Sequence, residues 1–147
     1  MRFELKYKTR NYEARHNDEE FRLQNHGAQN LGRYDFVKDV VGIEEFIASN
    51  PRAIGYCVLL TNDERYWKAS SRRNNVDALF HLHHGRVLEG ELAWSARTGV
   101  GTMRGREVSL KLAGRHDIEW HDYSTLETGK NGRFRCAFLK IVANAAG

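Results

Sequence analysis

The chain has 147 residues, of which 29% are charged and 41% hydrophobic, and it carries a formal net charge of +4. This length is enough for one domain with a substantial core, and the composition is typical of a globular protein rather than a disordered one. No apolar run approaches the roughly 20 residues that a membrane helix needs, and the N-terminus lacks a signal-peptide core, so we expect a cytoplasmic protein without a membrane partner. The basic charge balance is compatible with a nucleic-acid partner.

The first predicted strand covers residues 3–8, Phe3-Glu4-Leu5-Lys6-Tyr7-Lys8, in which apolar and charged residues alternate. A period of two is typical of a half-buried strand with one apolar and one charged face. Glu4 and Lys6 would lie roughly 6–7 Å apart along the charged face. This pair suits a metal-dependent phosphodiesterase, because a carboxylate can hold a divalent cation while an ammonium orients water or stabilises phosphate charge. An ordinary strand with a solvated face has the same pattern.

Residues 9–61 are predicted to form a hairpin, a helix and a second strand. Asn17-Asp18 marks a turn, across which residues 21–23 pair back as a short strand. Apolar residues from 33 to 49 recur at helical spacing, with Asp35 and Asp39 on the other side, and Asn50-Pro51 ends this helix. Residues 53–61 are nearly continuous in apolar side chains, as in a central strand covered on both faces. Together these pieces form a strand–helix–strand unit with parallel strands and a right-handed crossover.

The second half of the chain is predicted to be mainly β. A short helix over 76–83 ends at Gly85, and candidate strands follow at 88–94, 108–112, 118–120 and 134–142, separated by glycine-containing turns. Residues 144–147 are expected to form a loose tail. The predicted fold class is α/β in a single domain, 1–147, with a mixed sheet. Its strand–helix–strand core covers 3–68 and is extended by antiparallel strands from 76–143.

Four motifs stand in the following order: Glu4-Leu5-Lys6-Tyr7, Gly27-Ala28-Gln29, Arg33-Tyr34-Asp35-Phe36, and Leu59-Leu60-Thr61-Asn62-Asp63 followed by Tyr66-Trp67. Together they resemble the PD-(D/E)xK nuclease superfamily, and a bacterial group within it. The resemblance implies a restriction-endonuclease-like fold and Mg²⁺- or Mn²⁺-dependent hydrolysis of DNA, as an endo- or exonuclease. It implies that Glu4 binds the metal through its carboxylate and Leu5 through its carbonyl. Lys6 would be the catalytic lysine, and Gln29 and Tyr34 would face the site from the next helix.

The sequence departs from the superfamily at its N-terminal end. The superfamily core places a helix, two strands and a metal-binding Asp before the Glu-x-Lys strand, where this sequence has only Met1-Arg2-Phe3. Three alternatives follow: the chain is part of a longer protein, another subunit of a homo-oligomer supplies the missing carboxylate, or the protein is a relative that no longer cleaves. Asp63, at the end of the second strand, is a candidate substitute for the missing Asp. A scaffold that has lost its site would act as a non-catalytic nucleic-acid-binding or assembly module.

Several other polar and aromatic residues are also candidate ligands. The histidines at 81, 83 and 84, and the group Asp117, Glu119 and His121, are of metal-ligand type, but surface and strand-face positions explain them as well. Arg72, Arg73, Arg104 and Arg106 fall in predicted loops, where they would contact either phosphates or solvent. Trp67 is the tryptophan best placed for base stacking, whereas Trp94 and Trp120 are expected in the core. Cys57 and Cys136, the only cysteines, are predicted to be free buried thiols.

Overall fold

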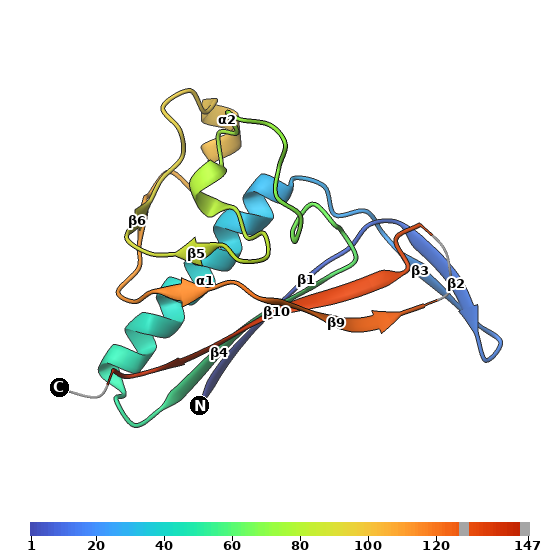
Figure 1. The fold of residues 1–147 in the computed structure, drawn as a ribbon, viewed down its shortest axis with the longest axis horizontal. Helices are drawn as coiled ribbons and strands as arrows, with labels where there is room; N and C mark the ends of the chain where they lie inside the picture. The colour runs from blue at the N-terminus through green and yellow to red at the C-terminus, as the bar shows by residue number, and fades with distance from the viewer. Residues whose placement is uncertain (127–129, 145–147) are drawn as a thin grey trace.

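The computed structural model describes residues 1–126 and 130–144, so only the first residue of the predicted tail lies within the described residues. Its centre is a four-stranded sheet in the order β1-β4-β10-β9 (Figure 1). These strands are β1 (Arg2–Lys8), β4 (Ile54–Thr61), β10 (Arg133–Val142) and β9 (Trp120–Thr125). β1 and β4 are parallel, while β10 runs antiparallel to both β4 and β9. The predicted α/β class, mixed sheet and parallel strand–helix–strand unit are therefore confirmed.

The long helix α1 (Gln29–Ser49) lies across one face of this sheet (Figure 1). Its buried apolar side chains include Val37, Val40, Ile43 and Ile47, as the helical spacing predicts. The close approach of helix and sheet depends on Gly55 in β4, because a Cβ atom at that position would overlap the Ile43 side chain. α1 begins earlier than the predicted residue 33 and ends, as predicted, just before Asn50-Pro51.

β1 turns its charged face, and not its apolar face, toward α1. Glu4 pairs in register with Cys57 and Lys6 with Leu59, and both β4 partners are fully buried on the helix side. Phe3, Leu5 and Tyr7 point the other way and are 52%, 60% and 43% exposed. The alternation of β1 is therefore as predicted, but the face that α1 covers is the charged one. In the described part of the chain β4 is covered on one face only, which corrects the prediction of two covered faces.

A hairpin of β2 (Tyr12–His16) and β3 (Glu19–Leu23) extends away from one end of the sheet (Figure 1). Its turn is formed by Asn17 and Asp18, both with positive φ (49° and 64°). Two consecutive left-handed residues produce the turn whose twist matches a two-stranded ribbon. Apart from glycine, Asn and Asp are the residue types that tolerate this conformation best. The hairpin predicted around Asn17-Asp18 is confirmed.

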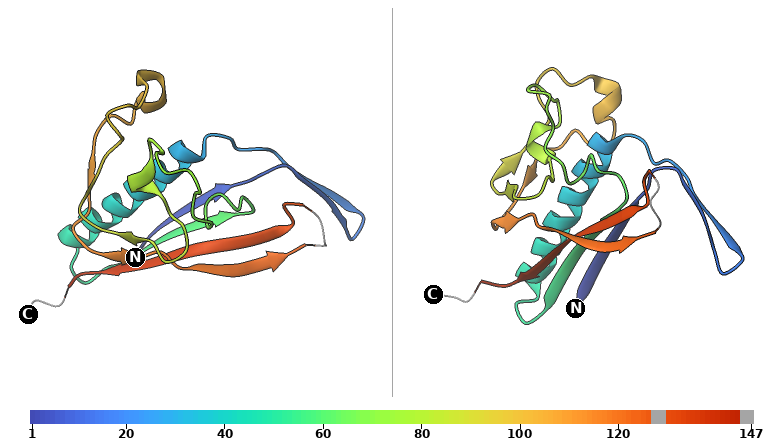
Figure 2. Two further views of the ribbon diagram at one scale, coloured as in Figure 1. Left: turned by 45° about the horizontal axis from the view of Figure 1, so that its top comes forward. Right: turned by 45° about the vertical axis from the view of Figure 1, so that its right-hand side comes forward.

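Residues 63–118 form an irregular layer that packs against α1 and, through Trp67 and Leu82, against Trp120 of β9 (Figure 2). Its elements are short: η1 (Ala78–Phe80), β5 (Val87–Leu88), β6 (Glu91–Leu92), α2 (Val100–Met103), β7 (Leu110–Lys111) and β8 (His116–Asp117). The predicted strand 88–94 is divided because Gly90 adopts a positive φ of 73°. The buried side chains of this layer include Phe80, Leu82, Leu88 and Ile118. The predicted extension 76–143 thus has two parts, a cover over α1 and the two strands β9 and β10 that complete the main sheet.

Both cysteines are free, with Cys57 buried on the helix side and Cys136 half-buried. Burial raises the pKa of Cys57 to about 12, so its thiol stays protonated and unreactive at neutral pH. Within residues 1–126 and 130–144, no helix is both long and apolar enough to cross a bilayer.

Candidate active site

The charged face of β1 meets an acidic stretch of α1. Lys6 Nζ lies 3.0 Å from the Asp39 Oδ2 atom, with 21% of the Lys6 side chain and 27% of the Asp39 side chain exposed. Glu4 shares the strand face of Lys6 because the two residues are two positions apart. Glu4, Lys6 and Asp39 are called the β1–α1 charged cluster below. This cluster places two carboxylates and one ammonium at the solvent-accessible edge of the sheet.

The electrostatics of the cluster show that its two carboxylates interact. Burial, the largest cause, raises the pKa of Asp39; the hydrogen bond and charge of Lys6 oppose this rise, and the negative charges of Glu4 and Asp35 add to it. Glu4 has a second ionic contact, with Arg2 at 3.1 Å. Carboxylates held close enough to perturb one another are typical of catalytic and cation-binding sites, although structural ion pairs produce the same effect.

Asp35 lies one helical turn before Asp39 and pairs with a different residue, Arg106. Arg106 donates two hydrogen bonds to it, at 2.7 and 2.9 Å. Burial acts to raise the pKa of Asp35, but the Arg106 hydrogen bonds and the charges of Arg106, Lys6 and Lys8 outweigh it and lower the pKa. Arg106, which the sequence placed in a phosphate-contacting or solvated loop, is thus used to anchor the irregular layer to α1.

The donor atoms of the cluster fit a hard divalent cation. Mg²⁺ prefers carboxylate oxygens and commonly takes only one or two from the protein, with waters and substrate phosphates completing its shell. Glu4 and Asp39 supply two such carboxylates, and the charge of Glu4 adds to the rise that burial, the largest cause, produces in the Asp39 pKa. Among the described residues, no group of three or more His, Cys, Asp or Glu side chains could hold a metal. Substrate and water oxygens are therefore required to complete any coordination shell here.

The structure does not bring Gln29 and Tyr34 to Glu4 and Lys6. Gln29 Nε2 donates a hydrogen bond of 2.8 Å to Asp63 Oδ2. Tyr34 is buried, its hydroxyl donates to the Val108 carbonyl at 2.8 Å, and its ring stacks on Trp94. In this structure both residues make contacts that hold the fold together, away from the Glu4–Lys6 pair.

Asp63 does not replace the carboxylate that the superfamily places before the Glu-x-Lys strand. It comes two residues after Thr61, which pairs with Lys8, whereas Glu4 pairs with Cys57, four residues or about 13 Å before Thr61 in β4. Asp63 is buried, and Arg65 and Gln29 both donate hydrogen bonds to it. Burial acts to raise its pKa, but these hydrogen bonds outweigh burial and lower the pKa. Asp63 is an ionised structural residue.

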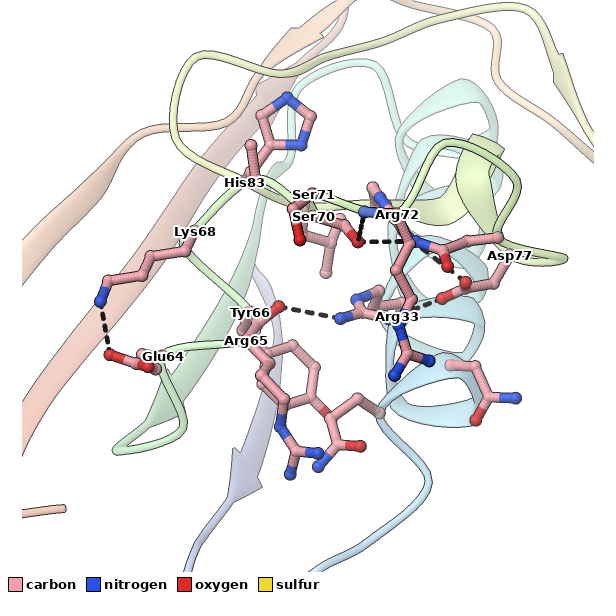
Figure 3. A pocket seen from close by; sticks show the side chains of 16 residues that line it. Arg33, Glu64, Arg65, Tyr66, Lys68, Ser70, Ser71, Arg72, Asp77 and His83 are labelled. Carbon is pink, nitrogen blue, oxygen red and sulfur yellow. Dashed lines mark hydrogen bonds and ion pairs between the residues drawn. The ribbon is translucent and has the colours of Figure 1, made fainter. Parts of the chain in front are cut away.

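A polar pocket of about 480 Å³ opens beside the N-terminal end of α1 (Figure 3). Its charged lining residues include Arg33, Glu64, Arg65, Lys68, Arg72 and Asp77. Several of these charges are paired within the walls: Arg33 with Asp77 at 2.6 Å, and Lys68 with Glu64 at 2.6 Å. His81 contacts Asp77 at 3.2 Å, so this histidine belongs to an ion-pair network and not to the surface. The pocket holds no metal-ligand cluster among the described residues.

The remaining candidates are separated in the structure. The Trp67 ring packs on Trp120 and carries the Arg135 guanidinium over its face, and it is too buried to stack on a base. His84 Nδ1 accepts a hydrogen bond from the Trp120 amide. Asp117 ends β8 before Glu119, and Glu119 lies 4.0 Å from His121 on the exposed surface. These groups do not form a common site.

Sequence reasoning missed the role of Asp39. It placed Asp35 and Asp39 on the side of α1 opposite the apolar residues, and the structure turns that side toward β1. The signal was present, because a helix that crosses over a strand with a charged inner face requires opposite charges on its own facing residues.

Comparison of the chain with protein-family models, with curated proteins and with solved structures gave no match.

Proposed function

We propose that this protein is a PD-(D/E)xK-type nuclease that hydrolyses DNA phosphodiesters with the help of Mg²⁺ or Mn²⁺. The observation that carries the proposal is the juxtaposition of Glu4 and Lys6 on β1 with Asp39 on α1. The parallel β1–α1–β4 unit with antiparallel β10 beside it supports a restriction-endonuclease-like arrangement. The net charge of +4 supports DNA as the partner.

Each residue of the cluster has a separate role in this proposal. Glu4 and Asp39 would hold the cation, and the Leu5 carbonyl is the proposed backbone ligand beside them. When bound, the cation would polarise the phosphodiester and neutralise charge that develops on it. Lys6 would orient the attacking water and stabilise the phosphate oxygens, because its ammonium lies 3.0 Å from Asp39 Oδ2 and its side chain shares a strand face with Glu4.

A cleavage assay with purified protein, duplex or single-stranded DNA and Mg²⁺ or Mn²⁺ tests the proposal. We expect Lys6→Ala to lower the rate by about 10²–10⁴-fold, because a positioned proton-transfer or charge-stabilising group contributes that much. Lys38→Ala is the matched control, since Lys38 is exposed on the same helix segment. The assignment of the site is wrong if Lys6→Ala cuts DNA as fast as Lys38→Ala and wild type.

A second candidate function is a non-catalytic nucleic-acid-binding module on the same scaffold. The observation that favours it is the internal pairing of the cluster, with Lys6 on Asp39 and Glu4 on Arg2. Such a module would bind DNA without added metal, with an affinity that falls steeply as salt rises, and Lys6→Ala would leave binding unchanged. A metal-dependent nuclease activity that requires Lys6 excludes this alternative.

A further inference from the structure

The face of the main sheet opposite α1 is apolar and uncovered in the described part of the chain (Figure 2). Residues opposite one another form continuous rows across the strands. Leu5, Val58 and Phe138 make the central row, and Phe3 and Tyr56 stand beside it. The Tyr56 ring lies 6.4 Å from that of Phe3 and 5.4 Å from that of Phe138. These residues form one connected apolar surface, called the open sheet face below.

The distribution of polar and apolar side chains on β1 indicates that the open sheet face is not a solvent-facing surface. A strand with one solvated face normally puts its polar residues on that face. β1 does the reverse, with Glu4 and Lys6 under α1 and Phe3, Leu5 and Tyr7 on the open side. Parallel strand pairs are, in addition, normally covered on both faces.

The exposed area is large enough for a stable contact. Phe3, Tyr7, Phe138 and Tyr123 are 52%, 43%, 47% and 65% exposed. Aromatic side chains bury about 150–250 Å² each, so these four alone expose roughly 400 Å². A standard interface buries about 800 Å² on each partner, and Leu5, Val58 and Val142 add to the aromatic area. A connected apolar surface of several hundred Å² often marks an interaction site.

We propose that the open sheet face is covered by the same face of a second copy of this chain. Two twisted sheets pack face to face with their strands about 30° apart, and a two-fold axis presents the same surface from both sides. The face carries few charges, with Lys140 and His121 as the basic side chains in its rows, so it offers an acidic or nucleic-acid partner little to bind. The dimer leaves the β1–α1 charged cluster accessible, since that cluster lies on the other side of the sheet.

Light scattering on the full chain after size exclusion tests the dimer. We expect wild type to have twice the 17.0 kDa mass of one chain, and Phe138→Glu and Val58→Glu each to raise the dissociation constant by at least about 100-fold, because each buries a carboxylate in the interface. Val100→Glu is the control, as Val100 is 77% exposed on α2, away from the sheet. Circular dichroism identifies any variant that fails to fold. If one glutamate variant does not fold, the dissociation constant of the other glutamate variant tests the dimer.

A wild-type mass of one chain at concentrations up to about 100 µM would overturn the proposal, and so would a dimer that both glutamate variants leave intact. Binding of an apolar dye to a monomeric wild type would assign the face to a different apolar partner and equally overturn it. The result is independent of DNA cleavage, since no residue of the charged cluster is changed.

Discussion

Neither the apolar pattern of the sequence nor the Glu-x-Lys motif predicts the contact between Lys6 and Asp39. Asp39 is half-buried against β1, and the charge of Glu4 contributes to its raised pKa. This makes Asp39, rather than Asp63, the second carboxylate near the Glu-x-Lys motif. The catalytic proposal therefore depends on a residue from the helix that follows the motif and not on a strand that precedes it.

Helical geometry explains why the structure does not bring Gln29 and Tyr34 together beside Glu4. At about 100° per residue, positions 29 and 34 lie about 140° apart around α1, whereas positions 35 and 39 lie within about 40° of each other. Gln29 and Tyr34 cannot both face Glu4, while Asp35 and Asp39 can face β1 together. The residue types near the site were predictable from the sequence, but which side of α1 meets β1 depends on tertiary packing.

Asp63 provides a pH test at the residue scale. Its pKa is lowered from the ordinary value of 3.8, so the unfolded state binds more protons as the pH falls through this range. The stability that Asp63 contributes is present above pH 3.8 and is lost as the pH falls through the lower folded-state pKa. We expect Asp63→Asn to be less stable than wild type at neutral pH and to lose less stability on acidification, as measured by urea unfolding between neutral and acidic pH.

Asp18→Asn is the control for this experiment, because the Asp18 side chain is 99% exposed in the hairpin turn. Equal acid sensitivity of the wild-type protein and Asp63→Asn would show that the ion pairs around Asp63 do not stabilise the fold.

At the scale of secondary structure, the packing of α1 on β4 depends on Gly55 and not on Gly42. A Cβ at Gly55 would overlap the Ile43 side chain, whereas a Cβ at Gly42 in the middle of α1 would meet nothing within 4 Å. We expect Gly55→Ala to destabilise the protein by about 1–3 kcal/mol through overpacking. Gly42→Ala should stabilise it by up to about 1 kcal/mol, because alanine is the better helix former.

Thermal or urea unfolding of the two glycine variants measures both effects on one helix–sheet contact. A Gly55→Ala variant as stable as Gly42→Ala would mean that α1 can move away from β4 without loss.

The long elements were predictable from the sequence, and the short ones were not. α1, β4 and β10 have sustained apolar patterns, and the Asn17-Asp18 turn specifies its hairpin locally. The strands of the irregular layer are only two residues long, so they carry no periodic signal. β1 shows the limit of the pattern itself: its alternation is clear, but the covered face is the charged one, where Asp39 of α1 pairs with Lys6 and Arg2 of β1 pairs with Glu4.

For the whole molecule, the two faces of the main sheet differ in chemical character. The helix-covered face carries the charged cluster at its β1 edge, and the open sheet face carries the apolar surface that we assign to a second copy. β1 contributes to both through alternate residues, Glu4 and Lys6 to one and Phe3 and Leu5 to the other. A dimer through the open face would therefore fix the strand that carries the proposed catalytic residues.

Titration with Mn²⁺, followed by electron paramagnetic resonance, tests most directly whether Glu4 and Asp39 form a cation site. We predict that wild type binds Mn²⁺ and that Glu4→Gln and Asp39→Asn each weaken binding by about tenfold or more, because each removes one carboxylate ligand. Glu45→Gln, at an exposed position of α1, should bind as wild type does. Mn²⁺ binding that is absent from wild type, or unchanged in both Glu4→Gln and Asp39→Asn, would contradict the proposed active site.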